Sequence, residues 1–513
     1  MNTKLFSATT IGIETYIVDV EVDLSYGLLQ FFIVGLPDTA IKESRQRVQT
    51  ALKNCAIKLP ERKITVNLAP ADLKKEGTVF DLPIALAILQ AAQIINIDRE
   101  FIQETLFLGE LSLDGSIKPV KGVIAVAYDA TKLGKKRLIV PKLNAQEAAL
   151  IKEIEVIGVN NLIELISYLK KEITIEPTIN NYQNIKNPNE KILDYNQVNG
   201  QIAAKKALKI SAAGRHNILL VGSPGSGKTM LAKRLPTIMP ELEFQEILEI
   251  SRIYSVSGKL KDKPLITKRP FRSPHHTISQ AGLVGGGSFP QPGEISLAHN
   301  GILFLDEFTE FKRNVLEVLR QPLEEHTVSI ARAQQTVSFP ASFLLVAAIN
   351  PCPCGFAMDK KRRCVCTSAQ VNRYIQKISG PLLDRIDLQV SVPSIEYKSI
   401  IDNNNQNNLS SLDLYKDIQT AIDIQKKRNN GIYNAYLESN DINKYCILTE
   451  NATELIKANF DLLNLTMRGY HKMLKVARTI ADLENSEYID SKHIKEALFY
   501  RSIDQKISQE SHS

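Results

Sequence analysis

A glycine-rich segment, residues 222–229, carries the clearest chemistry in this chain. It reads Gly-Ser-Pro-Gly-Ser-Gly-Lys-Thr and matches the phosphate-loop pattern G-x-x-x-x-G-K-[ST]. The apolar run 217–221 before it is typical of a buried strand, and we expect a helix to begin near Lys228. In that setting the backbone N–H groups of the loop and the positive end of the helix would surround phosphates. The segment predicts a site for ATP, formed by Gly222, Ser223, Pro224, Gly225, Ser226, Gly227, Lys228 and Thr229.

Acidic residues at a second predicted strand end would complete an ATP-hydrolysing site. Lys228 would reach the β- and γ-phosphates, and the Thr229 hydroxyl would hold Mg²⁺. The apolar strand 301–305 ends in Asp306 and Glu307. We expect Asp306 to contact the Mg²⁺ shell and Glu307 to polarise the attacking water.

A third apolar strand, 343–349, ends in Asn350. Ligands of parallel sheets bind at the carboxyl ends of the strands, so the Asn350 amide would face the γ-phosphate and the water. The alternative is a strand-terminal asparagine that makes a local turn.

Cysteines cluster just after this strand. Two C-x-C pairs offer four thiolates for a tetrahedral, structural Zn²⁺ site, because four thiolates leave no open position for catalysis. The alternative is four free thiols in a reducing cytosol. The loop between the pairs carries a run of basic residues that are candidates for DNA contact. The zinc candidates are Cys352, Cys354, Cys364 and Cys366, and the basic residues are Lys360, Lys361, Arg362 and Arg363.

The composition is that of a globular protein with several domains. The chain has 513 residues, of which 44% are hydrophobic and 23% charged. We find no apolar run of membrane-spanning length and no apolar leader, and we expect a cytoplasmic protein with no membrane partner. The net charge of +7 permits a polyanion partner, but a solvated basic surface explains it equally well.

Periodicity and polar stretches divide the chain. We expect an α+β domain at 1–171, a linker at 172–191, a P-loop α/β core with a parallel sheet at 192–400 that contains the cysteine insertion 352–366, a polar loop at 401–411, and a helical lid at 412–513. The strands expected in the first domain are 11–22, 28–34, 63–68 and 106–113, and the expected helices are 39–54, 82–94, 467–483 and 493–501.

Two further segments are candidates for DNA contact. Residues 327–338 predict a β-hairpin with Arg332 near its tip, which would bind phosphates without sequence preference. The polar, glycine-rich segment 272–287 contains His275 and His276. Internal hydrogen bonds explain these histidines as well as DNA contact does.

The motif Gly380-Pro-Leu-Leu-Asp-Arg-Ile-Asp387, together with the three strand ends, resembles the magnesium-chelatase-like branch of the AAA+ ATPases. In that branch the arginine of Leu-Leu-Asp-Arg reaches the ATP of the neighbouring subunit, which implies that Arg385 is an arginine finger. The segment 466–478 looks like the sensor-2 helix, which implies that Arg468 is the sensor. The alternative for either arginine is a surface salt bridge.

The whole chain is most similar to the ComM/YifB group of bacterial competence-related proteins. The resemblance lies in the strings at 32–38, 70–86, 108–115, 271–277 and 350–355. It implies a homo-hexameric, ATP-dependent DNA motor, a branch-migration helicase that acts on single-stranded or branched DNA in natural transformation and homologous recombination. The alternative is a chelatase-type motor that remodels a protein partner, although the chain has no Asp-x-Ser-x-Ser motif.

The first domain resembles the proteolytic domain of Lon-type proteases, which has the fold of ribosomal protein S5 domain 2. That family needs a Ser–Lys pair. Asp81 stands where the nucleophile should be and Ile124 where the lysine should be, and Thr78 has no evident base. We therefore expect a ring-building or DNA-contacting domain without protease activity.

Overall fold

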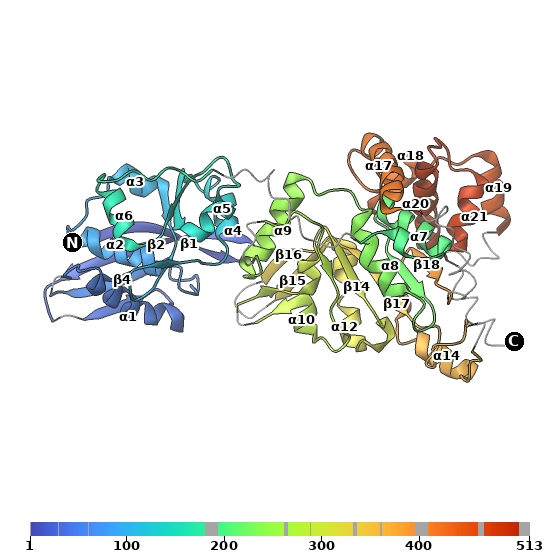
Figure 1. The fold of residues 1–513 in the computed structure, drawn as a ribbon, viewed down its shortest axis with the longest axis horizontal. Helices are drawn as coiled ribbons and strands as arrows, with labels where there is room; N and C mark the ends of the chain where they lie inside the picture. The colour runs from blue at the N-terminus through green and yellow to red at the C-terminus, as the bar shows by residue number, and fades with distance from the viewer. Residues whose placement is uncertain are drawn as a thin grey trace.

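A computed structural model describes residues 2–28, 30–59, 61–179, 193–260, 265–287, 289–331, 336–359, 362–394, 409–459 and 466–501. The molecule is elongated, with the N-terminal part at one end and the helices of the C-terminal part at the other (Figure 1). Among the described residues, no helix is both long and apolar enough to cross a membrane.

The N-terminal part begins with a sheet of strand order β1-β2-β4-β3. The first two neighbouring pairs are antiparallel, and β4 with β3 is parallel. The alternating buried and exposed residues of β2 place one face of the sheet on a core. The elements are β1 (Asn2–Ile11), β2 (Glu14–Ser25), β3 (Phe31–Val34), α1 (Thr39–Asn54), β4 (Lys63–Ala69) and α2 (Asp81–Ala91).

Two strand predictions are wrong in this part. The expected strand 11–22 is interrupted, because the chain turns at Gly12, whose φ of +63° suits glycine, and an unpredicted strand, β1, precedes the turn. The expected strand 106–113 is split into β5 and β6, because the backbone of Gly109 leaves the sheet to bond to Val79.

A parallel sheet of order β5-β8-β9 completes the N-terminal part. Its apolar side chains belong to the same core as the first sheet. The elements are α3 (Arg99–Glu104), β5 (Thr105–Phe107), β6 (Glu110–Leu111), β7 (Ile117–Lys118), α4 (Val123–Ala130), β8 (Arg137–Pro141), α5 (Lys142–Ala148), β9 (Glu155–Val159) and α6 (Leu162–Leu169).

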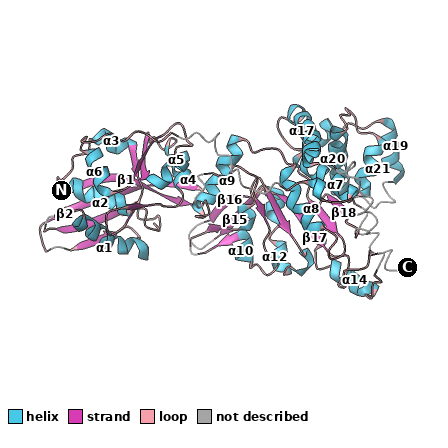
Figure 2. Ribbon diagram, in the orientation of Figure 1, coloured by secondary structure: helices cyan, strands magenta, loops and turns pink. Residues whose placement is uncertain are grey.

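The central part is built on a parallel sheet of order β11-β14-β17-β10-β18. Figure 2 shows its strands in magenta with helices, in cyan, packed around them. Its inner strands are buried throughout, as expected for a parallel sheet covered on both faces. The strands are β10 (Ile218–Val221), β11 (Phe271–Arg272), β12 (Gly285–Gly286), β13 (Gln291–Pro292), β14 (Ile302–Leu305), β15 (Thr327–Ala331), β16 (Thr336–Pro340), β17 (Leu344–Ile349) and β18 (Leu388–Ser391). The helices are α7 (Ile202–Gly214), α8 (Lys228–Arg234), α9 (Phe244–Val256), α10 (Gln280–Val284), α11 (Glu294–Leu297), α12 (Arg313–Glu317), α13 (Arg320–Glu325), α14 (Ser368–Ile375) and α15 (Gly380–Leu383).

Helices form the C-terminal part and share a core with α7 and the central sheet. A buried cluster of ion pairs lies within this part, where Arg428 and Arg478 both pair with the carboxylate of Asp482. Because Asp482 is buried, its charge needs these two partners. The helices are α17 (Ser411–Arg428), α18 (Ser439–Tyr445), α19 (Glu450–Asn459), α20 (Met467–Leu483) and α21 (Ser491–Phe499).

The N-terminal part is packed directly on the central part. The β1–β2 turn lies on the β15–β16 hairpin, so close that a Cβ on Gly12 would come within 2.5 Å of Val337 Cγ1. Arg252 on α9 donates to the carbonyl of Ile13 at 2.8 Å and pairs with Asp129 at 3.5 Å. The N-terminal part therefore contacts β16 of the hairpin at Val337, close to the end where the two strands turn.

Candidate nucleotide-binding site

The sheet brings together the three strand ends that the sequence singles out. Because β10, β14 and β17 are parallel neighbours, the residues that follow them share one edge. Lys228 Nζ lies 3.2 Å from Asn350 Oδ1 and donates to the carbonyl of Gly222 at 2.6 Å. Burial lowers the pKa of Lys228, and the nearby carboxylates Asp306 and Glu307 oppose that shift.

The magnesium candidates also meet at this edge. Thr229 Oγ1 donates to Asp306 Oδ2 at 2.7 Å. A hydroxyl and a carboxylate are the oxygen ligands that Mg²⁺ prefers, and the ion keeps its other positions for water and phosphates. The loop itself is shaped for phosphates, because Gly227 has a φ of +95° at the start of α8 and open space on its Cβ side. The donor set therefore fits a Mg²⁺–nucleotide complex.

Glu307 lies at the carboxyl end of β14, beside Asp306, and its side chain is exposed. Its backbone is left-handed, with a φ of 51°, and its side chain is 55% exposed. His276 Nδ1 lies 3.1 Å from Glu307 Oε2, and His275 contacts Thr277 at 2.9 Å. Both histidines thus have internal partners. The two residues meet because His276 follows β11 and Glu307 follows β14, and these strands are parallel neighbours. No motif in the sequence predicts this contact.

The four cysteines gather in one cluster. Their sulfur atoms all lie within 4.8 Å of one another, with Cys352 and Cys354 at 3.3 Å and Cys352 and Cys364 at 3.7 Å. Four thiolates on one Zn²⁺ would lie about 3.8 Å apart, given a Zn–S bond of about 2.3 Å. Burial raises the pKa of the Cys352 thiol to about 12. The donor set fits a closed, structural zinc site formed by Cys352, Cys354, Cys364 and Cys366.

The cysteine loop lies against the phosphate loop of the same chain. Gly355 has a φ of +85°, and a Cβ there would come within 2.6 Å of Pro224 Cδ. The cluster therefore supports the nucleotide loop, through a contact that the spacing of the cysteines does not reveal.

Arg385 lies at the opposite edge of the sheet from the phosphate loop. It precedes β18, which pairs in parallel with β10 so that Leu388 is opposite Ile218. Its carbonyl accepts from Asn217, the residue before β10, at 3.1 Å. Because the phosphate loop follows β10, the length of the strand separates Arg385 from its own nucleotide loop.

Arg468 lies on the same side as Arg385. On α20 it stands one turn before Lys472, which pairs with the buried Asp387 at 2.8 Å and fixes this face of the helix against the sheet. Arg385 Nη2 pairs with Glu324 Oε2 at 2.7 Å, and Arg468 Nη2 pairs with Glu324 Oε1. Hydrogen bonds from Arg385 and then Arg468 hold the pKa of Glu324 below its usual range. No motif had drawn attention to Glu324.

A cavity of about 570 Å³ opens beside these arginines. Basic side chains outnumber acidic ones in its lining, which suits a phosphate-bearing ligand. The charged lining residues are Arg215, Arg385, Arg468, Lys472, Lys475, Glu324, Asp387 and Glu438.

The DNA-contact candidates are described only in part. The hairpin predicted at 327–338 is formed by β15 and β16, but Arg332 lies outside the described residues, as do Lys360 and Lys361. Arg362 and Arg363 are exposed, and the guanidinium of Arg362 lies 5.0 Å from the centre of the Phe356 ring.

Asp81 has structural partners in the N-terminal part. It is fully buried and pairs with Arg47 Nε at 2.7 Å, and it accepts a hydrogen bond from Ser44. Ile124 is buried in the core.

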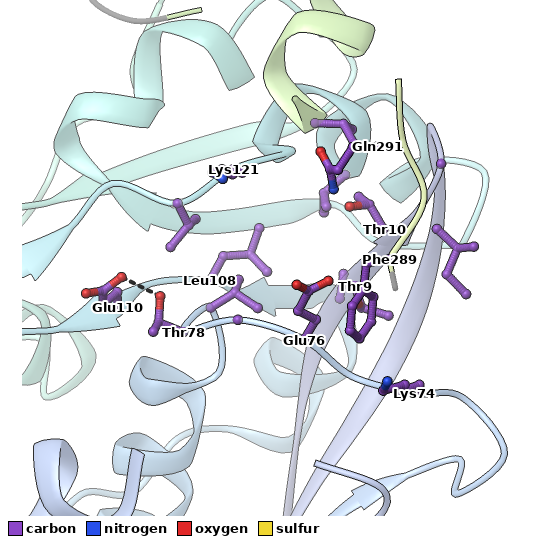
Figure 3. A pocket seen from close by; sticks show the side chains of 18 of the residues that line it. Thr9, Thr10, Lys74, Glu76, Thr78, Leu108, Glu110, Lys121, Phe289 and Gln291 are labelled. Carbon is purple, nitrogen blue, oxygen red and sulfur yellow. Dashed lines mark hydrogen bonds between the residues drawn. The ribbon is translucent and has the colours of Figure 1, made fainter. Parts of the chain in front are cut away.

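A cavity of about 1080 Å³ lies where the N-terminal part meets the central part. The hydrogen-bonded pair Thr78 and Glu110 lies on one side of this cavity, and Phe289 lies on the other (Figure 3).

Comparisons with known proteins agree with this architecture. Three family models match: "Magnesium chelatase, subunit ChlI" at residues 194–400, "Subunit ChlI of Mg-chelatase" at 20–144, and "Magnesium chelatase, subunit ChlI C-terminal" at 408–501. Competence protein ComM of Haemophilus influenzae is 40% identical over 501 residues, which is 97% of each chain. YifB of Escherichia coli is 40% identical over 501 residues, 96% of each chain. DNA replication licensing factor Mcm6 of Drosophila melanogaster is 23% identical over 322 residues, 58% of this chain and 34% of that one. The chain therefore belongs to the ComM/YifB family of magnesium-chelatase-like AAA+ proteins.

Proposed function

We propose that the chain is an ATPase that works as a ring, with each ATP bound between two copies. One observation carries the proposal: Lys228 lies at the carboxyl edge of the sheet, whereas Arg385 and Arg468 lie together at its amino edge. Because β10 lies between these arginines and the phosphate loop of their own chain, their position supports a role at the nucleotide of a neighbouring copy. The family resemblance supports six copies.

The residues of one copy then have distinct tasks. Lys228 binds the phosphates, and Mg²⁺ held by Thr229 and Asp306 would neutralise their charge. Glu307 orients and polarises the attacking water from the exposed end of β14. Asn350 holds the same water and the γ-phosphate from the next strand. Arg385 and Arg468 stabilise the charge that develops on the γ-phosphate of the neighbouring copy.

We further propose that the ring is a DNA motor for branch migration in natural transformation and recombination, working in the cytoplasm. The name of one relative, the DNA replication licensing factor Mcm6, supports a DNA partner, and the name of another, the competence protein ComM, supports a role in competence. The β15–β16 hairpin with Arg332 and the basic residues 360–363 would contact the phosphates of DNA. The ranges of the family models support a division into domains at 1–171, 192–400 and 412–513.

The partner is tested by measuring ATP hydrolysis with added DNA. We expect single-stranded or forked DNA to raise the rate, and binding to weaken linearly with salt on a log–log plot because phosphate contacts release counterions. Arg332→Ala should reduce both that slope and the DNA-dependent part of the rate. An assembled, ATP-bound ring with no affinity for single-stranded, duplex or forked DNA at low salt would favour the alternative, a motor that remodels a protein partner.

The cysteine cluster gives a prediction about metal. We expect one zinc per copy in freshly purified protein, and loss of that zinc in the Cys352→Ser/Cys354→Ser double variant. Because Gly355 lies against Pro224, the loss should also weaken ATP binding. Metal analysis and nucleotide titration measure the two effects, and Cys55→Ser, which removes a thiol outside the cluster, is the control. Protein that contains no zinc from the start would end this idea.

We propose that the N-terminal part is a Lon-like domain that builds the ring or contacts DNA without proteolysis. The buried pair of Asp81 with Arg47 supports this view, because a carboxylate committed to an ion pair cannot replace a nucleophilic serine. Thr78 has Glu110 as a hydrogen-bond partner, but a Ser–Lys type of mechanism needs an amine base.

A further inference from the structure

Glu324 holds two arginines of like charge next to each other. One carboxylate oxygen pairs with Arg385 at 2.7 Å and the other with Arg468. Two guanidinium groups that share one carboxylate lie close enough to repel each other, and the negative charge between them offsets this repulsion. Without Glu324 the two side chains would separate, since Arg468 is 46% exposed and has room to move.

Each arginine keeps N–H groups for a further ligand. A guanidinium carries five donors in a fixed plane. Arg385 uses Nη2 on Glu324 and Nη1 on the carbonyl of Pro381 at 2.6 Å, which leaves one hydrogen on each of these nitrogens. Its side chain is 11% exposed, so these contacts fix its direction. Glu324 can therefore orient the arginines without using up the donors that a phosphate needs.

The helix that carries Glu324 is firmly fixed. Leu319 and Pro322 on this segment are buried. His326, two residues after Glu324, accepts a hydrogen bond at its backbone carbonyl from the N–H of Ala341 at 2.7 Å. The His326 ring contacts the ring of Tyr436, with their centroids 4.6 Å apart. The carboxylate thus stands on a rigid base that contacts both the segment between β16 and β17 and, through Tyr436, the C-terminal part.

We propose that Glu324 is a positioning residue that sets Arg385 and Arg468 for the γ-phosphate of the neighbouring copy. The proposal rests on the proposed function, in which both arginines act on a neighbour. Glu324 touches neither the nucleotide nor the water; it acts through the arginines. Preorganised charge is a large part of catalysis, so the loss of Glu324 should lower turnover and leave ATP binding by the phosphate loop intact.

The test compares Glu324→Gln with Glu325→Gln. The two substitutions remove the same charge from adjacent exposed residues of one helix, but Glu325 bonds only to Gln321 among the contacts of its side chain that the structure gives. We expect kcat of Glu324→Gln to fall about 10- to 100-fold, since a misplacement of about 1 Å can cost 10²-fold, with KM for ATP within about twofold. Glu325→Gln should match the unaltered protein, and both variants should melt at the same temperature. Glu324→Asp, which keeps the charge on a shorter side chain, should recover part of the rate.

Mixed rings separate positioning from a general structural role. Glu324→Gln copies retain Lys228 and Glu307, so they should regain hydrolysis when Lys228→Ala copies supply intact arginines beside them. A kcat for Glu324→Gln equal to or above that of Glu325→Gln, a loss confined to KM, or no recovery in mixed rings would each overturn the proposal. If Arg385→Ala also hydrolyses ATP at the normal rate, the proposed function itself fails; if Arg385→Ala is inactive and is complemented in mixed rings, only the role of Glu324 fails.

Discussion

Glu307→Gln is expected to bind ATP and assemble into rings as the unaltered protein does, while its turnover falls about 10²- to 10⁴-fold. The amide has the size of the carboxylate but cannot accept the proton of the attacking water. Glu307 stands at the open end of β14, next to the Asp306 that contacts Thr229. Steady-state hydrolysis, nucleotide titration and sizing of the ring measure the three properties separately.

Glu310→Gln is the matched control for this prediction. Glu310 lies one short 3-10 turn further along the chain and pairs with Lys377 at 3.5 Å on the surface. It should keep the normal rate, because an exposed ion pair contributes little. Turnover of Glu307→Gln within about threefold of the unaltered protein would remove Glu307 from the role of polarising water.

The sequence was sufficient to predict a helix or strand where the residues of that one element determine its bounds. The helices at 39–54 and 467–483 have the predicted bounds, because each has an N-terminal cap and one apolar face. The parallel arrangement of β10, β14 and β17 was likewise predictable, since each strand is apolar throughout and is followed at once by the phosphate loop, by Asp306 or by Asn350.

Contacts between distant segments were not predictable from the sequence. The β1–β2 turn at Gly12 interrupts a run in which apolar and polar residues alternate as in a single strand. The hairpin forms because β1 pairs with β2 over the whole length of β1. Glu324 belongs to no motif, and it meets Arg385 and Arg468 only because α13, α15 and α20 converge at one edge of the sheet. The support of Pro224 by Gly355 depends in the same way on tertiary packing.

The position of Arg385 at the amino edge of the sheet predicts a large loss of ATP hydrolysis when this residue is replaced. Arg385→Ala copies should be inactive alone, with a rate about 10³-fold or more below normal, as for arginine fingers of other NTPases. Lys228→Ala copies should also be inactive, because they cannot hold the phosphates. Each variant lacks what the other has, so a mixed ring contains interfaces at which an intact nucleotide loop faces an intact Arg385.

Mixing the two variants should therefore restore part of the hydrolysis, in an amount that follows the statistical fraction of intact interfaces. The proposed role of Arg385 on a neighbouring copy predicts this result, and it is supported by the length of β10 between Arg385 and the phosphate loop of its own chain. Rings of Lys228→Ala mixed with Glu307→Gln are the control, because both substitutions damage the same side of an interface and no intact site can form. Well-mixed rings of Arg385→Ala and Lys228→Ala that stay inactive would mean that Arg385 is a structural residue of its own chain.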